Sequence, residues 1–357
     1  MGKKLFILAP YPHGQAPSQR FRFEQYMDFF KESGFEVEFH PFLSEKTWKS
    51  LYVNGSFFRK AFGMMGSFWR RFILLFRLKK AHTILIHREA SMVGPPLFEW
   101  AIAKVLRKKY VYDFDDAIWL PNYSESNAKF HRLKAYGKVK KIMKWAGSIS
   151  AGNQYLMDYA LKFNKNVSII PTTIDLENVH NRPTNHQANP PVIGWTGTHT
   201  TMHYLEEILP VLKELEKQYE FIFRVISNEN PSFELTSFEF VKWNKVDEIK
   251  DLSSFSIGIM PLSDTIWAKG KCGFKGLQYM ALEIPSIISP VGVNSSIVEH
   301  GQNGYLCQDA SEWKAHLIEL LESPELRQKI GKLGYETVRE HFSVASNKPI
   351  YAKLLGI

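Results

Sequence analysis

The chain has 357 residues, of which 45% are hydrophobic and 23% are charged, a composition typical of a globular protein large enough for two domains. No stretch approaches the roughly 18 to 20 consecutive apolar residues that a membrane-spanning helix needs. The two cysteines, Cys272 and Cys307, are too few for a disulfide framework or a thiolate metal site. We therefore expect a cytoplasmic protein without disulfides or redox chemistry.

Positive charge is concentrated in the first half of the chain. Residues 1–175 contain 28 Lys and Arg against 14 Asp and Glu, which leaves 17 basic and 22 acidic side chains for residues 176–357. Such a field suits anionic lipid, nucleic acid or a phosphorylated acceptor, although solvated helix faces would give the same composition. No nucleic-acid-binding module accompanies the charge, so we expect no nucleic-acid partner.

Strand-like apolar runs alternate with segments of helical period through the first half. The runs are residues 5–9, 37–40, 83–87, 110–114, 148–151 and 167–170. Alternation of this kind predicts a parallel sheet covered by helices on both faces, with ligand sites where the strands end. A polar stretch rich in Pro and Asn, residues 177–191, interrupts the pattern and is interpreted as an interdomain linker.

The alternating pattern restarts after the linker. Strands are expected at residues 192–196, 221–226, 257–260 and 286–289, and closing helices around residues 313–321 and 325–342. A helix with its apolar face along residues 205–215 is expected to be kinked by Pro210. The sequence therefore predicts an α/β fold with two similar domains.

The strongest local motif is a glycine-containing turn that opens a helix at residues 270–281. Backbone N–H groups at a helix N-terminus, with Lys271 and Lys275 beside them, form a site for a diphosphate. An ordinary helix start with surface lysines has the same pattern. A second glycine turn, residues 194–201, follows a predicted strand; it is either a ligand site or a helix start capped by its threonines.

The whole chain resembles the GT-B glycosyltransferases of the large retaining family 4, the group 1 type of bacterial sugar transferases. The segments that carry the resemblance are IPTTID at 170–175, GWTGTHTT at 194–201, LQYMALEIP at 277–285, SPVG at 289–292 and EHGQNGYL at 299–306. The resemblance implies two Rossmann-like domains that face each other across a cleft. They would be an acceptor-side domain at 1–175, a linker at 176–191, a nucleotide-sugar-binding domain at 192–340 and a helix at 341–357 that crosses back.

The resemblance also implies a donor site on the C-terminal domain, for a UDP- or GDP-sugar. Lys271 and Lys275 would neutralise the departing diphosphate, so that no metal or other cofactor would be required. The expected donor contacts are Gly197, Thr198, Lys271, Lys275, Gln278 and Asn294.

Two positions of this segment depart from the family. The family commonly carries two glutamates eight residues apart, and the aligned residues here are Gly270 and Gln278. The second glutamate usually holds the ribose hydroxyls, a task that an amide can share, and the first usually faces the sugar. A catalytically weak nucleotide-sugar-binding or scaffold subunit of a polysaccharide assembly complex is therefore the alternative to an enzyme.

Three carboxylates follow the strand predicted at residues 110–114. Asp113 and Asp115 form an Asp-x-Asp, which in another glycosyltransferase fold holds a divalent metal, but the two-domain pattern argues against that fold. Asp115 or Asp116 is instead expected to orient or deprotonate an acceptor hydroxyl. A helix cap or a structural salt bridge explains either residue equally well.

Arginines occupy two of the predicted strand-to-helix loops. Arg20 and Arg22 follow the first strand, and Arg88 follows the third. Each is expected to contact the acceptor or a phosphate by bidentate hydrogen bonds, or else to form a surface ion pair. His87 is a possible acid or base, although a lone histidine is more often structural.

Residues 57–80 interleave aromatic and aliphatic side chains with seven Lys and Arg residues. This pattern predicts an interfacial helix, in which each basic residue contributes about 1 kcal/mol near an anionic lipid surface. The alternative is that its apolar face packs on the N-terminal sheet. The resemblance implies a metal-independent hexosyltransferase that uses a glycan or lipid-linked acceptor in cell-surface polysaccharide or glycoconjugate synthesis. If residues 57–80 form an interfacial helix, the enzyme would be peripheral on the inner face of the plasma membrane.

Overall fold

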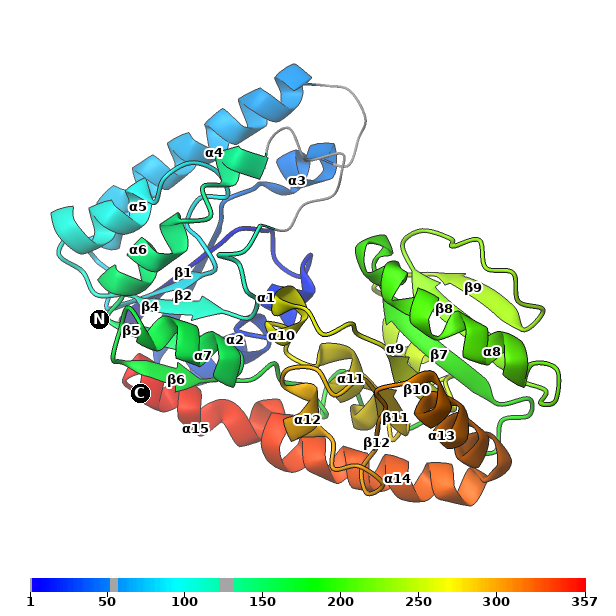
Figure 1. Ribbon diagram of the computed structural model, residues 1–357. Helices are drawn as coiled ribbons and strands as arrows, with labels where there is room; N and C mark the ends of the chain where they lie inside the picture. The colour runs from blue at the N-terminus through cyan, green and yellow to red at the C-terminus, as the bar shows by residue number, and fades with distance from the viewer. Residues whose placement is uncertain (1, 52–56, 122–130) are drawn as a thin grey trace. The chain divides into compact units, whose positions relative to one another are not determined.

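The computed structural model describes residues 2–51, 57–121 and 131–357. The chain divides into two compact units (Figure 1). Unit 1 consists of Met1–Thr172 together with Lys348–Ile357, and unit 2 is Thr173–Asn347.

Unit 1 is built on a parallel sheet of six strands in the order β2-β1-β3-β4-β5-β6. Strand β1 is Lys3–Ala9, and its residues from Leu5 onward are at most 1% exposed, as expected for an inner strand covered on both faces. The remaining strands are β2 (Phe35–Pro41), β3 (Thr83–His87), β4 (Val111–Phe114), β5 (Ser148–Ala151) and β6 (Val167–Ile169).

Helices cover both faces of this sheet (Figure 1). The final helix, α15 (Val344–Leu355), begins in unit 2 and ends in unit 1, where the ring of Tyr351 lies 4.3 Å from that of Tyr26. The α-helices before it are α1 (Pro17–Arg20), α2 (Met27–Glu32), α3 (Glu45–Leu51), α4 (Phe57–Leu78), α5 (Leu97–Trp100), α6 (Lys138–Trp145) and α7 (Gln154–Leu161). Shorter 3-10 and π turns are η1 (Glu24–Tyr26), η2 (Ala101–Val105) and η4 (His131–Lys134).

Unit 2 has a second parallel sheet of six strands, in the order β12-β11-β10-β7-β8-β9. Residues of β7 alternate between two core clusters: Ile193 and Trp195 belong to one, and Val192 belongs to the other. The strands are β7 (Val192–Gly197), β8 (Ile222–Ser227), β9 (Phe238–Lys242), β10 (Ile257–Met260), β11 (Ser286–Ile288) and β12 (Tyr305–Leu306).

The helices of unit 2 correct one expectation. Pro210 does not kink a continuous helix: a 3-10 helix, η5 (His199–Glu207), is followed by α8 (Leu209–Leu215), and Pro210 lies in the first turn of α8, where no backbone N–H is needed. The other helices are α9 (Glu248–Leu252), α10 (Ile266–Lys269), α11 (Phe274–Ala281), α12 (Asn294–Ile297), α13 (Ala310–Glu322), α14 (Pro324–Thr337) and the π turn η6 (Val338–Phe342). Within the described ranges, no helix is both long and apolar enough to cross a membrane.

Candidate active site

A glycine turn ends β7 in unit 2. Gly197 is the last residue of the strand, and a Cβ there would lie 2.5 Å from the indole of Trp195, so the backbone path requires glycine. Thr198 follows at the N-cap of η5, where its hydroxyl lies 2.8 Å from that of Thr200. Because β7 is a central strand, this turn lies at the edge of the sheet where open α/β folds bind ligands.

The N-terminus of α11 is the second part of this region. Gly273 caps the helix with a φ of 66°, in the left-handed region that favours glycine, and a Cβ there would lie 2.3 Å from Cδ1 of Ile297. The first N–H groups of a helix have no partner within the helix, and its dipole attracts anions. Lys275 lies in this first turn and adds a positive charge.

Two lysines lie over indole rings at this end of α11. Nζ of Lys271 is 4.9 Å from the centroid of Trp267, and Nζ of Lys275 is 5.3 Å from that of Trp195. The indole of Trp195 therefore contacts both the Gly197 turn and Lys275. Burial, together with the charge of Lys271, lowers the pKa of Lys275 from 10.5 to about 7. A bound anion would reverse this shift, because it favours the charged lysine.

Both amides expected at the donor are almost fully buried. Nε2 of Gln278 lies 3.4 Å from Nε2 of His180, inside unit 2. Asn294 donates from Nδ2 to the carbonyl of Ser289 at 2.9 Å, whereas its buried Oδ1 accepts no hydrogen bond from any described residue. That oxygen is 3.3 Å from the position that a Cβ of Gly273 would take, so it lies beside the N-terminus of α11. A ligand that donates a hydrogen bond would satisfy it.

In unit 1, Asp113 of β4 is the centre of a buried polar network. Oδ2 of Asp113 lies 2.7 Å from Nδ1 of His87, and Oδ1 accepts from Ser150 at 2.7 Å and from Arg22. Burial alone would raise the pKa of Asp113, but Arg22 and His87 hold it well below its usual range. Arg22 also donates to the carbonyl of Ile170, so it connects strands β4 and β5 to the residue that follows β6. This is a structural role, which differs from the substrate contact expected from the sequence.

Arg88 brings together the two other carboxylates that follow β4. Its Nη2 lies 2.7 Å from Oδ1 of Asp115 and 3.6 Å from Oδ2 of Asp116. Burial opposes ionisation of Asp115, yet the charge of Arg88 lowers the pKa of this carboxyl. A carboxylate with a lowered pKa is a weak base, so Asp115 is suited to orienting a hydroxyl rather than deprotonating it. Arg20 is half-buried, with its guanidinium 5.0 Å from the ring of Phe21.

Comparison with known proteins identifies the C-terminal part of the chain. Residues 190–323 match the family model described as glycosyl transferases group 1. This segment is similar to the group 1 glycosyltransferases. It contains every residue of the site built around Trp195 and α11.

The full chain has the GT-B fold of solved glycosyltransferases. Anabaena HepE in complex with UDP-glucose matches with a TM-score of 0.69 at 13% identity, covering 100% of both chains. A glycosyltransferase from Rickettsia africae matches with a TM-score of 0.69 at 14% identity, covering 99% of this chain and 98% of that one. Sucrose-phosphate synthase from Thermosynechococcus elongatus matches with a TM-score of 0.67 at 14% identity, covering 99% and 98%. The predicted fold class is confirmed.

One curated relative matches a shorter stretch. N-acetyl-alpha-D-glucosaminyl L-malate synthase of Bacillus anthracis is 32% identical over 100 residues, which are 28% of this chain and 25% of that protein. The match therefore spans only a quarter of the relative's length.

Some residues of the two polar regions described above were not predicted from the sequence. Trp195 lies two residues before Gly197 in the same strand. Because alternate residues of a strand share a face, the sequence could have placed Trp195 beside the glycine turn. His180 lies in the linker, and no periodicity indicates that it packs against Gln278. In unit 1, Lys134 belongs to a run of basic residues that is typical of a solvated helix face.

Proposed function

We propose that the chain is a retaining glycosyltransferase that moves a hexose from a UDP- or GDP-sugar to a glycan or lipid-linked acceptor. The observation that carries this proposal is the convergence of Lys275, the Gly197 turn and the N-terminus of α11 around the indole of Trp195. Cations, a close backbone approach and the N-terminus of a helix are what a diphosphate needs. The group 1 family match supports the same reaction class.

In the proposed reaction, an acceptor oxygen attacks the anomeric carbon while the bond from that carbon to the diphosphate breaks. The acceptor proton passes to the departing phosphate oxygen on the same face, as the family resemblance implies. Lys271 and Lys275 stabilise the negative charge that develops on the diphosphate, so the step needs no metal. The lowered pKa of Asp115 agrees with this scheme, because no strong base is required.

The nucleotide sugar is further supported by the structures that share the fold. HepE was solved in complex with UDP-glucose, and another match is the lipopolysaccharide outer core galactosyltransferase WaaB, with a TM-score of 0.62 at 13% identity. We extend both features to this chain as a proposal: a nucleotide-diphosphate sugar as donor, and a role in cell-surface polysaccharide or glycoconjugate synthesis.

A catalytically weak binding or scaffold subunit remains the second candidate, because of Gly270 and Gln278. Gly270 has no side chain to face the sugar, and the amide of Gln278 is buried against His180. Such a subunit would bind the nucleotide sugar without turnover. Slow hydrolysis of the donor by the purified protein, abolished in the Lys271→Ala/Lys275→Ala double variant, would exclude it.

The first experiment is a thermal-shift screen against UDP, GDP, ADP, CMP and their common sugar conjugates. A ligand at 100 times its dissociation constant stabilises the folded protein by about 2.7 kcal/mol. We expect a selective rise in the unfolding temperature with UDP or GDP and their sugars, and no rise in the Lys271→Ala/Lys275→Ala variant. Equal shifts for wild type and variant would contradict the proposed donor site.

We also propose that the protein works from the cytoplasm at an anionic membrane surface, through residues 57–80. Helix α4 exposes a continuous stripe of large apolar side chains at helical spacing, each between 46% and 76% exposed. The stripe consists of Phe58, Phe62, Met65, Trp69, Phe72, Ile73 and Phe76. An exposed apolar face of this length marks an interaction surface.

The opposite face of α4 is the one that packs on unit 1. Leu74 and Leu78 are buried there, and Arg71 donates to the carbonyls of Ala90, His40 and Ala9 at 2.9, 2.9 and 3.2 Å. The helix therefore does not use its aromatic stripe to cover the sheet. The helix contains no acidic residue, whereas its basic residues complement anionic lipid.

Vesicle co-sedimentation tests the membrane proposal. The protein should bind vesicles of phosphatidylglycerol and phosphatidylcholine more strongly than vesicles of phosphatidylcholine alone. The triple variant Trp69→Ser/Phe72→Ser/Phe76→Ser should lose this binding without losing stability, because the side chains are exposed. Leu161→Ser, at an exposed position of α7, is the control. Equal binding of wild type and triple variant would contradict the proposal.

A further inference from the structure

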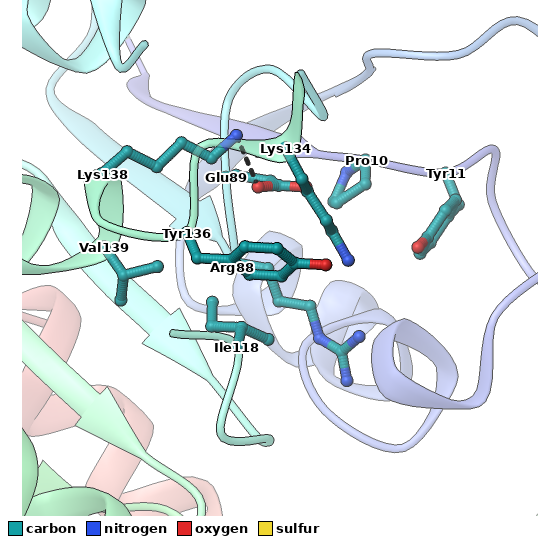
Figure 2. A pocket seen from close by; sticks show the side chains of 9 residues that line it. All are labelled: Pro10, Tyr11, Arg88, Glu89, Ile118, Lys134, Tyr136, Lys138 and Val139. Atoms are coloured by element: carbon teal, nitrogen blue, oxygen red, sulfur yellow. Dashed lines mark ion pairs between the residues drawn. The ribbon is translucent and has the colours of Figure 1, made fainter. Parts of the chain in front are cut away.

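A small polar hollow lies at the carboxyl ends of the strands of unit 1 (Figure 2). Pro10 and Tyr11 come directly after β1, and Arg88 and Glu89 come directly after β3. The remaining lining residues, which follow β4 in the chain, are Ile118, Lys134, Tyr136, Lys138 and Val139. Ligands of parallel α/β sheets bind at this edge.

Each charged side chain that lines the hollow forms an ion pair, except one. Lys138 is paired with Glu89, with 2.8 Å between Nζ and Oε2, and donates to the carbonyl of Ser91. Arg88 is paired with Asp115 and Asp116. For Lys134, by contrast, the described part of the chain supplies no carboxylate within ion-pair distance. Its Nζ lies 5.7 Å from the centroid of the Tyr136 ring.

Lys134 is directed into the hollow rather than into solvent. Figure 2 shows its ammonium group beside the hydroxyl of Tyr136 and above the guanidinium of Arg88, with Tyr11 on the opposite side. Burial, and the nearby charges of Arg88 and Lys138, lower the pKa of Lys134 despite the opposing charge of Glu89. Burial is the largest cause of this shift, so a bound anion that pairs with the ammonium group would favour its charged form.

The backbone at Arg88 is held in an uncommon conformation. Its φ of 57° is in the left-handed region, which side chains other than glycine rarely adopt. Hydrogen bonds fix it there: the N–H of Arg88 donates to the carbonyl of Asp113 at 2.7 Å, and the hydroxyl of Tyr112 donates to the carbonyl of Arg88 at 2.7 Å. Strain retained in this way is found at functional sites, and here it fixes the guanidinium at the wall of the hollow.

The hollow is too small for a sugar ring. Its volume is about 20 Å³. A single water needs roughly 10 to 15 Å³ on this measure, so one or two oxygen atoms of a ligand would fill it. A phosphate or carboxylate could insert its oxygens while the rest of the molecule extends outward.

We propose that this hollow binds an oxyanion of the acceptor, with Lys134 as the charge that neutralises it and Arg88 and Tyr136 as hydrogen-bond donors. The inference rests on the proposed glycosyl transfer only for the identity of the ligand as acceptor. The oxyanion is either the phosphate of a lipid-linked acceptor or the carboxylate of an acidic sugar, since both present the same oxygens to these donors.

The test measures anion binding directly, so it does not depend on catalysis. The unfolding temperature is followed during titration with inorganic phosphate or acetate, at constant ionic strength, in the Lys271→Ala/Lys275→Ala background that removes the donor-site lysines. We expect at least one anion to raise the unfolding temperature. Lys134→Gln should weaken the apparent affinity about tenfold or more, as expected for loss of a charged partner. Lys140→Gln, which removes an exposed charge from α6, should leave it unchanged.

The outcomes separate this proposal from the proposed function. A response to phosphate alone supports a phosphate-bearing acceptor, and a response to acetate alone supports an acidic sugar. The hollow is not an anion site if neither anion raises the unfolding temperature, or if the response is the same with and without Lys134. Failure of the proposed function would show elsewhere, as wild-type protein that neither binds nor hydrolyses any nucleotide sugar.

Discussion

Two buried arginines of unit 1 and one buried lysine of unit 2 respond in opposite ways to their surroundings. In unit 1, the carboxylates of Asp113, Asp115 and Asp116 outweigh burial and raise the pKa of Arg22 and Arg88 above the usual value. In unit 2, burial and a second lysine lower the pKa of Lys275 to about 7, with no carboxylate contributing. The fold itself therefore neutralises these two arginines, whereas for Lys275 we propose that a bound ligand supplies the negative charge.

The largest expected effect comes from breaking the ion pair in unit 1. Asp113→Ala leaves the guanidinium of Arg22 buried without its carboxylate, which should destabilise the protein by about 3 to 5 kcal/mol. Urea denaturation followed by circular dichroism measures the change. Asp28→Ala, whose partner Lys31 is exposed, should cost less than about 0.5 kcal/mol.

A second variant separates charge from packing at this position. If the loss arises from the unpaired guanidinium, the Asp113→Ala/Arg22→Met double variant should recover part of the stability lost by Asp113→Ala. A loss below about 1 kcal/mol in the single variant would mean that the network is not essential to unit 1.

The next largest effect concerns the lysine of unit 2. Lys275→Ala should weaken binding of the nucleotide sugar by about 10- to 100-fold, since a charge-assisted hydrogen bond contributes about 1.5 to 3 kcal/mol. The same change should not lower stability, because burial disfavours the charged form of Lys275. Isothermal titration and thermal unfolding measure the two quantities. Lys269→Ala, at a more exposed lysine of α10, is the control and should bind the donor as wild type does.

The smallest expected effect is a pH dependence of donor binding that arises from Lys275. Binding of an anion raises the pKa of Lys275 above 7, so binding takes up a proton and affinity should fall as pH rises from 7 to 9, by at most about tenfold per pH unit. In Lys275→Ala the affinity should be flat over this range. The stability of the protein without ligand should depend on pH in the opposite direction. Between pH 7 and 10.5 the unfolded chain keeps Lys275 protonated while the folded chain does not, so the contribution of Lys275 to the free energy of unfolding rises with pH.

Much of the fold was predictable because its strands are buried and regular. The runs at residues 83–87, 148–151 and 257–260 coincide with β3, β5 and β10. The pattern does not predict β9 and β12, which are the two edges of the second sheet. The strand β9 is only partly buried, and β12 has two residues, too few to show a period of two.

The candidate site was predictable where a short local motif indicates it, as at the helix-opening turn that contains Gly273 and Lys275. It was not predictable where the partner comes from a distant part of the chain. Asp113 pairs with Arg22, 91 residues away, and no local pattern distinguishes this buried arginine from Arg20. Likewise, the aromatic spacing of α4 indicates an amphipathic helix, but which face is exposed depends on how Arg71 anchors it.

The most direct test of the donor site compares nucleoside diphosphates with monophosphates by isothermal titration. If Lys271 and Lys275 hold the second phosphate, UDP or GDP should bind the wild-type protein at least about tenfold more tightly than the corresponding monophosphate, a difference of 1.4 kcal/mol. In Lys271→Ala/Lys275→Ala this preference should disappear while monophosphate binding persists. A preference that survives in the double variant, or that is absent from the wild type, would contradict the assignment of these lysines to the diphosphate.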